Sequence, residues 1–242
     1  AGRALVEKGR ADGVIVRAAR VAGQRTGRIG VLVAPGGERS FVADRRAADG
    51  LRPDDLRPAW FNDIDLVHLP AYSLLAEPLG LAGRRAIELA RERLALVSLD
   101  LASIGPLLSR GRRAARDLVR DVAADILFGT EKESEALLGR YGLEGLLEFA
   151  GIAIVKQGSR GATVLAREGE SAPLRFEIAT SSVAVADTTG AGDAFDAGFL
   201  ATWLAARAAG RPIAAALHRA ALVGHRAAIR HLTGPRPELP PG

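Results

Sequence analysis

Cysteine and methionine are absent from the 242 residues, and lysine occurs at only three positions. Without cysteine, the chain can form neither a disulfide framework nor a thiolate metal site. No apolar run approaches the roughly 20 residues that a membrane-spanning helix needs. The first residues, AGRALVEKGRADG, lack the apolar segment of a signal peptide. We therefore expect no membrane partner and, by default, a cytoplasmic location.

Arginine supplies most of the positive charge in a chain whose formal net charge is +5. A basic balance of this kind can mark a nucleic-acid-binding protein. Here, however, the arginines are scattered among alanines and acids. The densest group, within residues 110–116, has Asp117 and Asp121 beside it. This pattern favours a solvated arginine surface, so we expect no nucleic-acid partner.

Short apolar segments alternate with longer segments of helical periodicity along most of the chain. Apolar residues make up 48% of the sequence, which is enough for a sizeable core. This alternation is typical of a parallel α/β sheet covered by helices on both faces. It predicts strands at residues 14–16, 65–69, 94–100, 124–128 and 152–156 and within 174–186, and helices at 75–93, 112–122, 143–149, 191–209 and 212–231.

The segment 27–44 departs from this alternation. Its sequence, GRIGVLVAPGGERSFVAD, predicts two strands around a turn at Pro35-Gly36-Gly37. We interpret it as part of a small β lid within residues 14–44. Exposed edges of such strands often pair, so a homodimer through the lid is an expected partner interaction. No linker marks a boundary, and residues 1–242 are predicted to form a single domain.

The segment VADTTGAGDAFDAGF, residues 185–199, places two glycines and an acid at a predicted helix start. The first N–H groups of a helix lack intrahelical partners and favour anions, above all phosphates. Gly190 and Gly192 have no Cβ atoms, so a phosphate oxygen can approach the backbone closely. A carboxylate at Asp193 would repel a phosphate unless it had a task there. The fitting task is to accept the proton of a hydroxyl group that attacks the phosphorus.

Other nucleotide-binding motifs do not fit this sequence. A Rossmann fingerprint needs a third glycine where Phe195 stands, and no lysine lies in the Gly-Lys-Ser/Thr context of a Walker A motif. The structural alternative is an ordinary N-capped helix, with Asp187 or Thr188 as the cap and the glycines serving a sharp turn. The residues alone leave this alternative open.

The stretch DTTGAGDAF closely resembles the second signature of the PfkB, or ribokinase-like, carbohydrate kinase family. The resemblance implies a three-layer ribokinase-like α/β fold, with a mostly parallel sheet flanked by helices and a small β lid. It implies that Asp193 is the catalytic base. It also implies an anion hole for the transferred phosphoryl group, formed by the amides of Gly190, Ala191 and Gly192.

A second stretch, VKQGSRGATV, resembles the strand-turn-strand on the nucleotide side of this family. Lys156, Gly158 and Gly161 take the matching positions, so the resemblance implies ATP as the cofactor. A glycine turn after a buried strand would let the backbone approach a ligand, although an ordinary hairpin has the same pattern. VSLDLASIGPL resembles the family's strand that ends in an acid, here Asp100, which either faces the site or simply ends the strand.

The resemblance also implies metal positions. The family has Asn-x-x-Glu around the magnesium–phosphate cluster, where this chain has Thr130 in place of asparagine and a matching Glu133. Mg²⁺ is therefore an expected cofactor, carried mainly by the nucleotide phosphates. The alternative for Glu133 is a favourable charge in the first turn of a helix. In several members the positions of Asp187 and Thr189 help hold a monovalent cation, which implies K⁺.

Parts of the family pattern are missing or altered. The family normally opens with a strand, an aspartate that binds sugar hydroxyls and a Gly-Gly-x-x-x-Asn segment, and none of these is found here. With the absence of methionine, this predicts that the N-terminal segment of the domain is missing from the chain. On the last helix, Leu222 and Val223 fall where an adenine contact is expected, and surface or capping roles are assigned to His218, His225 and His231.

The leading hypothesis is an ATP-dependent kinase that phosphorylates a hydroxyl group of a small sugar or sugar-like acceptor. A non-catalytic regulator of the same fold, which binds a sugar or a nucleotide, is the alternative from another class. The threonine at position 130 and the missing N-terminal segment favour that alternative. A nucleoside kinase would share the chemistry and differ only in the acceptor pocket.

Overall fold

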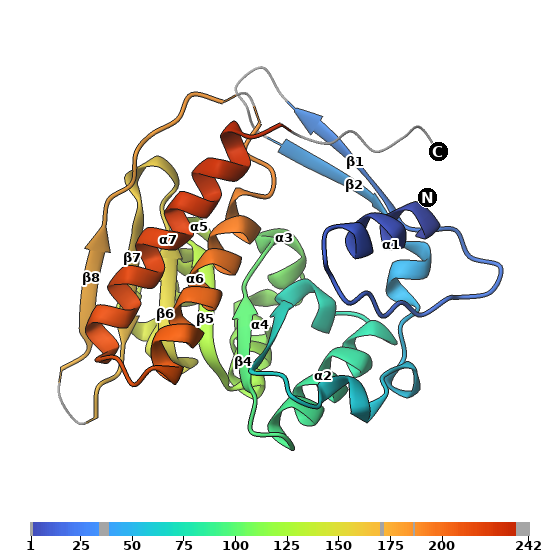
Figure 1. Ribbon diagram of the computed structural model, residues 1–242, viewed down its shortest axis with the longest axis horizontal. Coiled ribbons are helices and arrows are strands. Elements are labelled where there is room, and N and C mark those ends of the chain that lie inside the picture. The colour runs from blue at the N-terminus through green and yellow to red at the C-terminus, as the bar shows by residue number, and fades with distance from the viewer. Residues whose placement is uncertain (1, 34–38, 170–171, 186, 236–242) are drawn as a thin grey trace.

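A computed structural model describes residues 2–33, 39–169, 172–185 and 187–235 (Figure 1). Its main sheet has six strands in the order β3-β4-β5-β6-β7-β8. Strands β3 to β6 run parallel, whereas β7 is antiparallel to both of its neighbours, as predicted for a mostly parallel sheet. The strands are β3 (Leu66–Pro70), β4 (Leu96–Asp100), β5 (Ala124–Thr130), β6 (Ala150–Lys156), β7 (Ala162–Ala166) and β8 (Leu174–Ile178).

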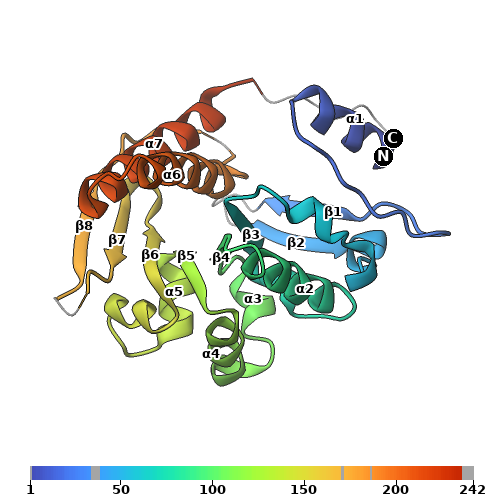
Figure 2. The ribbon, with the colours of Figure 1, turned by 60° about the horizontal axis from the view of Figure 1, so that its bottom comes forward.

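Helices cover both faces of this sheet (Figure 2). Neighbouring residues of a strand point to opposite faces, so Leu127 packs into one layer and Phe128 into the other. The three predicted layers are therefore present. One face is covered by α2 (Leu79–Arg91), α4 (Gly111–Val122) and α5 (Glu131–Leu138), and the other by α6 (Ala191–Ala208) and α7 (Ile213–Thr233).

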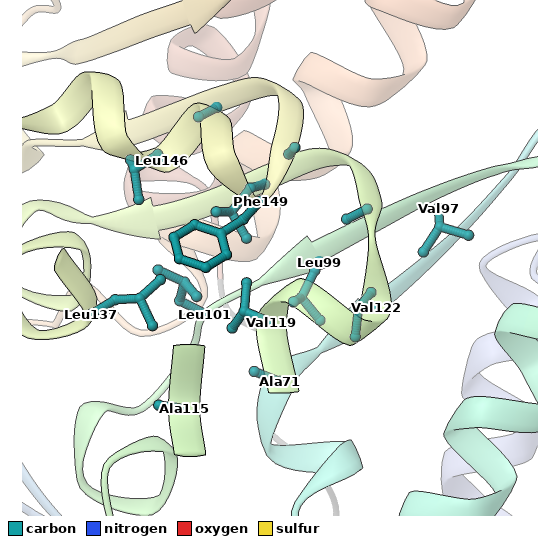
Figure 3. Close-up of a cluster of buried hydrophobic side chains, with 14 of the residues drawn as sticks. Ala71, Val97, Leu99, Leu101, Ala115, Val119, Val122, Leu137, Leu146 and Phe149 are labelled. Atoms are coloured by element: carbon teal, nitrogen blue, oxygen red, sulfur yellow. The ribbon is translucent and has the colours of Figure 1, made fainter. Parts of the chain in front are cut away.

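The layer beneath α4 is a continuous apolar core (Figure 3). Ala115, Val119 and Val122 recur at helical spacing and are all buried. They meet Val97 and Leu99, neither of which has any exposed surface. Each fully buried side chain of this size contributes about 1.5–3 kcal/mol. This core holds the strands whose carboxyl ends carry the predicted site.

The two C-terminal helices approach each other closely. A Cβ on Gly224 of α7 would lie 2.9 Å from the carbonyl oxygen of Phe195 on α6, closer than real Cβ atoms come. The rings of Phe128 on β5 and Phe199 on α6 meet edge to face, with centroids 5.4 Å apart. These contacts fix the start of α6 relative to the ends of the strands.

The predicted hairpin is confirmed as β1 (Arg28–Val33) and β2 (Arg39–Asp44), which pair antiparallel. The predicted turn at Pro35-Gly36-Gly37 lies outside the described residues. Figure 1 shows the hairpin above the carboxyl ends of the parallel strands. Its exposed apolar side chains include those of Ile29, Val31, Leu32 and Val42.

One predicted strand is wrong. Residues 14–16 form no strand, and Val14 and Ile15 are exposed because no neighbouring segment pairs with them. Within 174–186 only β8 is a strand, and residues 179–185 are irregular. β8 is the last strand of the sheet, so the chain beyond it must return across the strand ends to reach α6. The glycine turn is therefore preceded by a loop rather than by a strand.

The remaining elements are short. The predicted helix at 143–149 is a 3₁₀ helix, since its few residues include Gly145, a poor helix former. None of the helices that the structure describes is long and apolar enough to cross a membrane. The short elements whose bounds are not given above are α1 (Gly2–Ala11), α3 (Ile104–Leu107) and the 3₁₀ helices Arg46–Asp49, Pro53–Asp55, Pro58–Phe61, Ala71–Leu74, Leu143–Glu148 and Gly158–Arg160.

Candidate active site

The predicted site residues meet at the carboxyl edge of the parallel strands. A pocket of about 890 Å³ lies there, between the strand ends, the starts of α5 and α6, and α7. This edge is where α/β sheets usually bind ligands. Of the predicted site residues only Asp187 is not part of the wall, which includes Thr130, Glu133, Lys156, Gly158, Gly161, Thr189, Gly190, Ala191, Gly192 and Asp193.

The turn before α6 depends on Gly190. Its φ of +81° is left-handed, and a Cβ there would lie 2.6 Å from Nε2 of His231. The N–H of Ala191 donates to the Thr188 carbonyl oxygen at 3.2 Å, and the first intrahelical bond runs from Ala194 to Gly190. The intervening amides, those of residues 192 and 193, are the orphan donors of a helix start. Of the amides predicted for the anion hole, that of Ala191 is thus already engaged, whereas those of Gly192 and the neighbouring Asp193 are open to an anion.

Asp187 and Thr189 form a compact turn beside this helix start. Oδ1 of Asp187 accepts hydrogen bonds from the Thr189 backbone N–H at 2.9 Å and from the Thr189 hydroxyl at 2.7 Å. Asp187 therefore does not cap α6, whose N-cap is Gly190 without a side-chain bond. Nε2 of His231, in the last turn of α7, lies 2.9 Å from the Thr189 carbonyl oxygen. The loop and α7 together support the glycine turn.

Lys156 takes part in a buried ionic cluster at the floor of the pocket. Its ammonium group donates to Oδ2 of Asp100 at 2.8 Å and to both carboxyl oxygens of Asp196 at 3.0 and 3.1 Å. Its side chain is 12% exposed, and those of Asp100 and Asp196 are 10% and 2% exposed. A Cβ on Gly192 would lie 3.4 Å from this ammonium. The cluster therefore sits directly beneath the predicted anion hole.

The electrostatics of this cluster assign a proton to one carboxyl group. Burial raises the pKa of Asp196 well above its usual value. Burial acts in the same sense on Asp100, but the Lys156 charge and hydrogen bonds from Asp196, Lys156 and the Ala102 N–H outweigh it and lower the pKa of Asp100. Burial opposes the charge of Lys156, yet the two aspartates raise the pKa of Lys156. Of the two carboxyl groups, Asp196 therefore holds a proton more readily, while Asp100 forms the ion pair with Lys156.

Asp196 and His68 are parts of this region that the sequence did not reveal. The signal for Asp196 was present, because it shares a helix face with Phe199 and is therefore an acid inside an apolar stripe. His68 on β3 carried no such signal. Its Nδ1 lies 2.7 Å from the Ser98 hydroxyl, and burial lowers the pKa of His68 against the charges of Asp100 and Asp193.

Thr130 and Glu133 form a capping box at the start of α5. The Thr130 hydroxyl accepts from the Glu133 N–H at 3.3 Å, and Oε2 of Glu133 accepts from the Thr130 N–H at 2.7 Å. Oε1 of Glu133 accepts from the Ser103 N–H at 3.0 Å. The electrostatic helix-start role is thus present, and each carboxylate oxygen keeps a further lone pair toward the pocket.

The turn between β6 and β7 is built on two glycines. Gly158 has a φ of +60° and Gly161 a φ of +106°, and a Cβ on Gly161 would lie 2.0 Å from the Ile178 carbonyl oxygen. No other residue fits there. The turn belongs to the predicted hairpin, β7 pairing with β6, and it also lines the pocket. The two interpretations of this segment are therefore compatible.

The last helix reaches the pocket further along than predicted. Leu222 and Val223 lie outside the pocket wall, which α7 meets through His225, Ala228, Ile229 and Leu232. His218 is exposed as predicted. His225 is not a surface residue, since it is buried against the Phe195 ring at a centroid distance of 5.0 Å.

The possible metal ligands around the pocket suit a nucleotide that carries its own metal ion on its phosphates. Among the described residues, no group of three or more histidine, aspartate or glutamate side chains is placed to hold a metal ion. Mg²⁺ does not need such a group, because it keeps several waters and binds through substrate phosphates with one or two carboxylates. Glu133 is one of the carboxylates at the wall, with Asp100 and Asp193.

The comparisons with known proteins agree with this geometry. The sequence matches the model of the pfkB family carbohydrate kinases over residues 1–238. It is 32% identical to Fructokinase-1 of Zea mays over 183 residues, which are 72% of this chain and 55% of that protein. It is 42% identical to the ATP-dependent ribose-1-phosphate kinase of Halopiger xanaduensis over 88 residues, which are 34% of this chain and 26% of that protein.

Solved structures share the fold. The adenosine kinase from Sinorhizobium meliloti superposes with a TM-score of 0.81 at 26% identity, covering 98% of this chain and 71% of that one. The predicted ribokinase-like fold is confirmed. The chain spans about half the length of the curated relatives it matches. On its sequence, its fold and the residues gathered in its pocket, the chain belongs to the pfkB family of carbohydrate kinases.

Proposed function

We propose that the protein is an ATP-dependent kinase that phosphorylates a hydroxyl group of a small sugar or sugar-like acceptor. One observation carries the proposal: Asp193 is exposed to the pocket in the first turn of α6, directly beside the orphan amides of the helix start. Anion-binding amides and a carboxylate side by side meet the needs of phosphoryl transfer to a hydroxyl. The names of the relatives support the reaction class.

The chemistry follows from this placement. The Asp193 carboxylate accepts the proton of the acceptor hydroxyl as its oxygen forms a bond to the γ-phosphorus of ATP. The bond between that phosphorus and the bridging oxygen breaks, and ADP leaves. The amides of Gly192 and Asp193, with the positive end of the α6 dipole, take the negative charge of the transferred group. Mg²⁺ bound with the nucleotide would neutralise charge on the phosphates.

The nucleotide is proposed to lie between the β6–β7 turn and α7. Gly158 and Gly161 let the backbone of that turn approach the ligand, and Ile229 and Leu232 offer an apolar surface for the base. Glu133 stands at the phosphate end, where it would hold waters of the magnesium ion. A monovalent cation at Asp187 and Thr189 would compete with the His231 contact to the Thr189 carbonyl oxygen.

An ADP-release assay on the purified protein tests the proposal, with fructose, ribose 1-phosphate and adenosine as the first acceptors. Turnover with an acceptor of this class is expected. ATP binding without turnover on any sugar or nucleoside would instead support the regulator.

Replacing the proposed base gives the sharpest kinetic test. Asp193→Asn keeps the size of the side chain but removes its capacity to take a proton. We expect kcat to fall by about 10²–10⁴-fold, the usual contribution of a general base. The dissociation constant of ADP, measured by calorimetry, should change little. Asp117→Asn, at an exposed position of α4, is the matched control. A variant at 193 with wild-type kcat would show that another group takes the proton.

A further inference from the structure

The buried cluster of Lys156, Asp100 and Asp196 joins three elements that meet only at the pocket. Lys156 ends β6, Asp100 ends β4, and Asp196 lies in the second turn of α6. The ammonium bridges both carboxyl groups at 2.8 to 3.1 Å and lies 5.7 Å from the centroid of the Phe128 ring. The ammonium is thus held by two carboxyl groups and an aromatic ring, each from a different element.

The cluster also reaches the helix start itself. Asp196 follows Asp193 by three residues, so the two side chains are neighbours on α6. The ammonium stands 3.4 Å from the position that a Cβ on Gly192 would take. A movement of Lys156 or Asp196 would therefore move the backbone that carries the orphan amides and the proposed base.

We infer that Lys156, Asp100 and Asp196 form a positioning unit that holds the first turns of α6 against the ends of β4 and β6. This inference rests on the proposed kinase function. It gives Lys156 a role other than nucleotide binding, because its donors are directed to the two aspartates. Lys156 acts through the helix start, so it is a positioning residue.

The charge balance of the unit explains why an acid is tolerated at position 196. Two carboxyl groups that share one ammonium in a buried site keep a proton between them, since like charges at short range cannot both ionise. The unit is then neutral overall. The other titratable groups at this edge of the sheet are His68, Glu133, Asp187, Asp193, His225 and His231.

The test compares binding of a ground-state ligand with binding of a transition-state analogue. Magnesium–ADP and magnesium–ADP–aluminium fluoride are titrated into the wild type and Lys156→Met. A misplaced helix start should weaken binding of the aluminium fluoride complex and lower kcat, both by about 100-fold. Binding of ADP should change by less than about 3-fold. Loss of general stability alone would not separate the two ligands.

Lys156→Met leaves buried carboxyl groups without their cation, which can prevent folding. A variant in which the cluster has no charged groups is therefore tested beside this single substitution. It combines Lys156→Met, Asp100→Asn and Asp196→Asn, and it should fold while still losing affinity for the aluminium fluoride complex. Asp196→Asn, which mimics the protonated acid, should lose at least 10-fold less kcat than Asp196→Ala. Asp125→Asn is the control, because that carboxylate bonds to the Val97 N–H at the opposite edge of the sheet.

The outcomes are distinct. Wild-type turnover together with unchanged aluminium fluoride binding in folded Lys156 variants would overturn the positioning unit and leave the kinase function intact. Equal losses in Asp196→Asn and Asp196→Ala would overturn the assigned proton and with it the unit as described. Absence of turnover in the wild type with every acceptor would overturn the proposed function and the inference together.

Discussion

At the scale of single residues, Asp193 and Asp196 show how strongly the surroundings of a carboxyl group decide its role. They are one helical turn apart on α6. Asp193 is exposed to the pocket, whereas Asp196 is 1% exposed and contacts Lys156 through both oxygens. An exposed carboxylate can accept a proton from a substrate. A buried one whose oxygens are both engaged by Lys156 is placed to bind and position its neighbours.

The proton on Asp196 has a consequence for stability. Burial raises the pKa of Asp196, so the folded protein keeps a proton that the unfolded chain loses above about pH 3.9. The stability due to this group is therefore complete below that pH and is lost as the pH rises toward the folded-state pKa. Between about pH 3.9 and the folded-state pKa, folding must supply a proton that the free side chain does not carry.

Asp196→Asn removes this requirement, because asparagine is neutral at every pH. We expect the variant to unfold at a higher temperature than the wild type at pH 7. Each unit of raised pKa corresponds to about 1.4 kcal/mol of stability gained. The difference should shrink as the pH is lowered to 4. Melting curves from pH 4 to pH 8 measure it, and a difference that does not vary with pH would contradict the assignment of the proton.

The part of the site that could be predicted from the sequence is the part written in consecutive residues. The glycines at 190 and 192 and the acid at 193 are neighbours in the chain, so their joint chemistry can be predicted from the sequence. Lys156 was recognised by position, but its partners were not, because Asp100 and Asp196 lie 56 and 40 residues away. Only the packing of β4, β6 and α6 brings these charges together.

At the scale of elements, the order of strands and helices was largely predictable and the loops were not. Buried strands such as β5 and β6 are short apolar runs, and helices such as α6 are long alanine-rich runs. Residues 183–185, Val-Ala-Val, resemble a strand because they are apolar and include two β-branched valines. Whether such a run pairs depends on a partner strand, and beyond β8 none follows among the described residues.

The turn between β6 and β7 offers a matched pair of substitutions. Gly161→Ala would place a Cβ 2.0 Å from the Ile178 carbonyl oxygen at a φ of +106°. We expect a loss of about 3 kcal/mol or more in the free energy of unfolding, as for strongly strained backbone. The KM for ATP should rise with it, because the turn lines the proposed nucleotide side.

Gly158→Ala is the control for this change. Its φ is +60°, and a Cβ there meets nothing within 4 Å. The substitution should lower the free energy of unfolding by only about 1–2 kcal/mol, the cost of a left-handed backbone conformation at a residue with a Cβ. Urea unfolding and initial-rate kinetics measure both variants. Equal effects would mean that the close approach of β8 to this turn does not constrain it.

At the scale of the whole molecule, the two sides of the pocket differ in how they are held. The phosphoryl-transfer side rests on the central sheet and on two buried layers. Above the pocket, but outside the wall that the described residues form, lies the β1–β2 hairpin, whose apolar side chains are exposed. We propose this hairpin as a lid over the acceptor. Because little of its apolar surface is buried, the hairpin contributes little to the stability of the sheet.

The hairpin can be removed without pulling on its surroundings. Its ends meet, since a Cβ on Gly27 would lie 2.5 Å from the Arg45 carbonyl oxygen. Replacing residues 28–44 with two glycines should therefore leave the melting temperature nearly unchanged. The KM for the acceptor should rise at least 10-fold while the KM for ATP stays within about 3-fold, because a lid excludes water and holds the acceptor.

Light scattering on the same two samples tests the predicted homodimer. If the exposed apolar strands pair between two chains, the wild type has twice the mass of one chain and the shortened protein has the mass of one. Ile29→Ser with Val42→Ser is the milder control, which keeps the backbone of the hairpin and removes apolar surface. A shortened protein with unchanged acceptor KM would show that the acceptor is held by other parts of the molecule. The hairpin would then be an interface or a free flap rather than a lid.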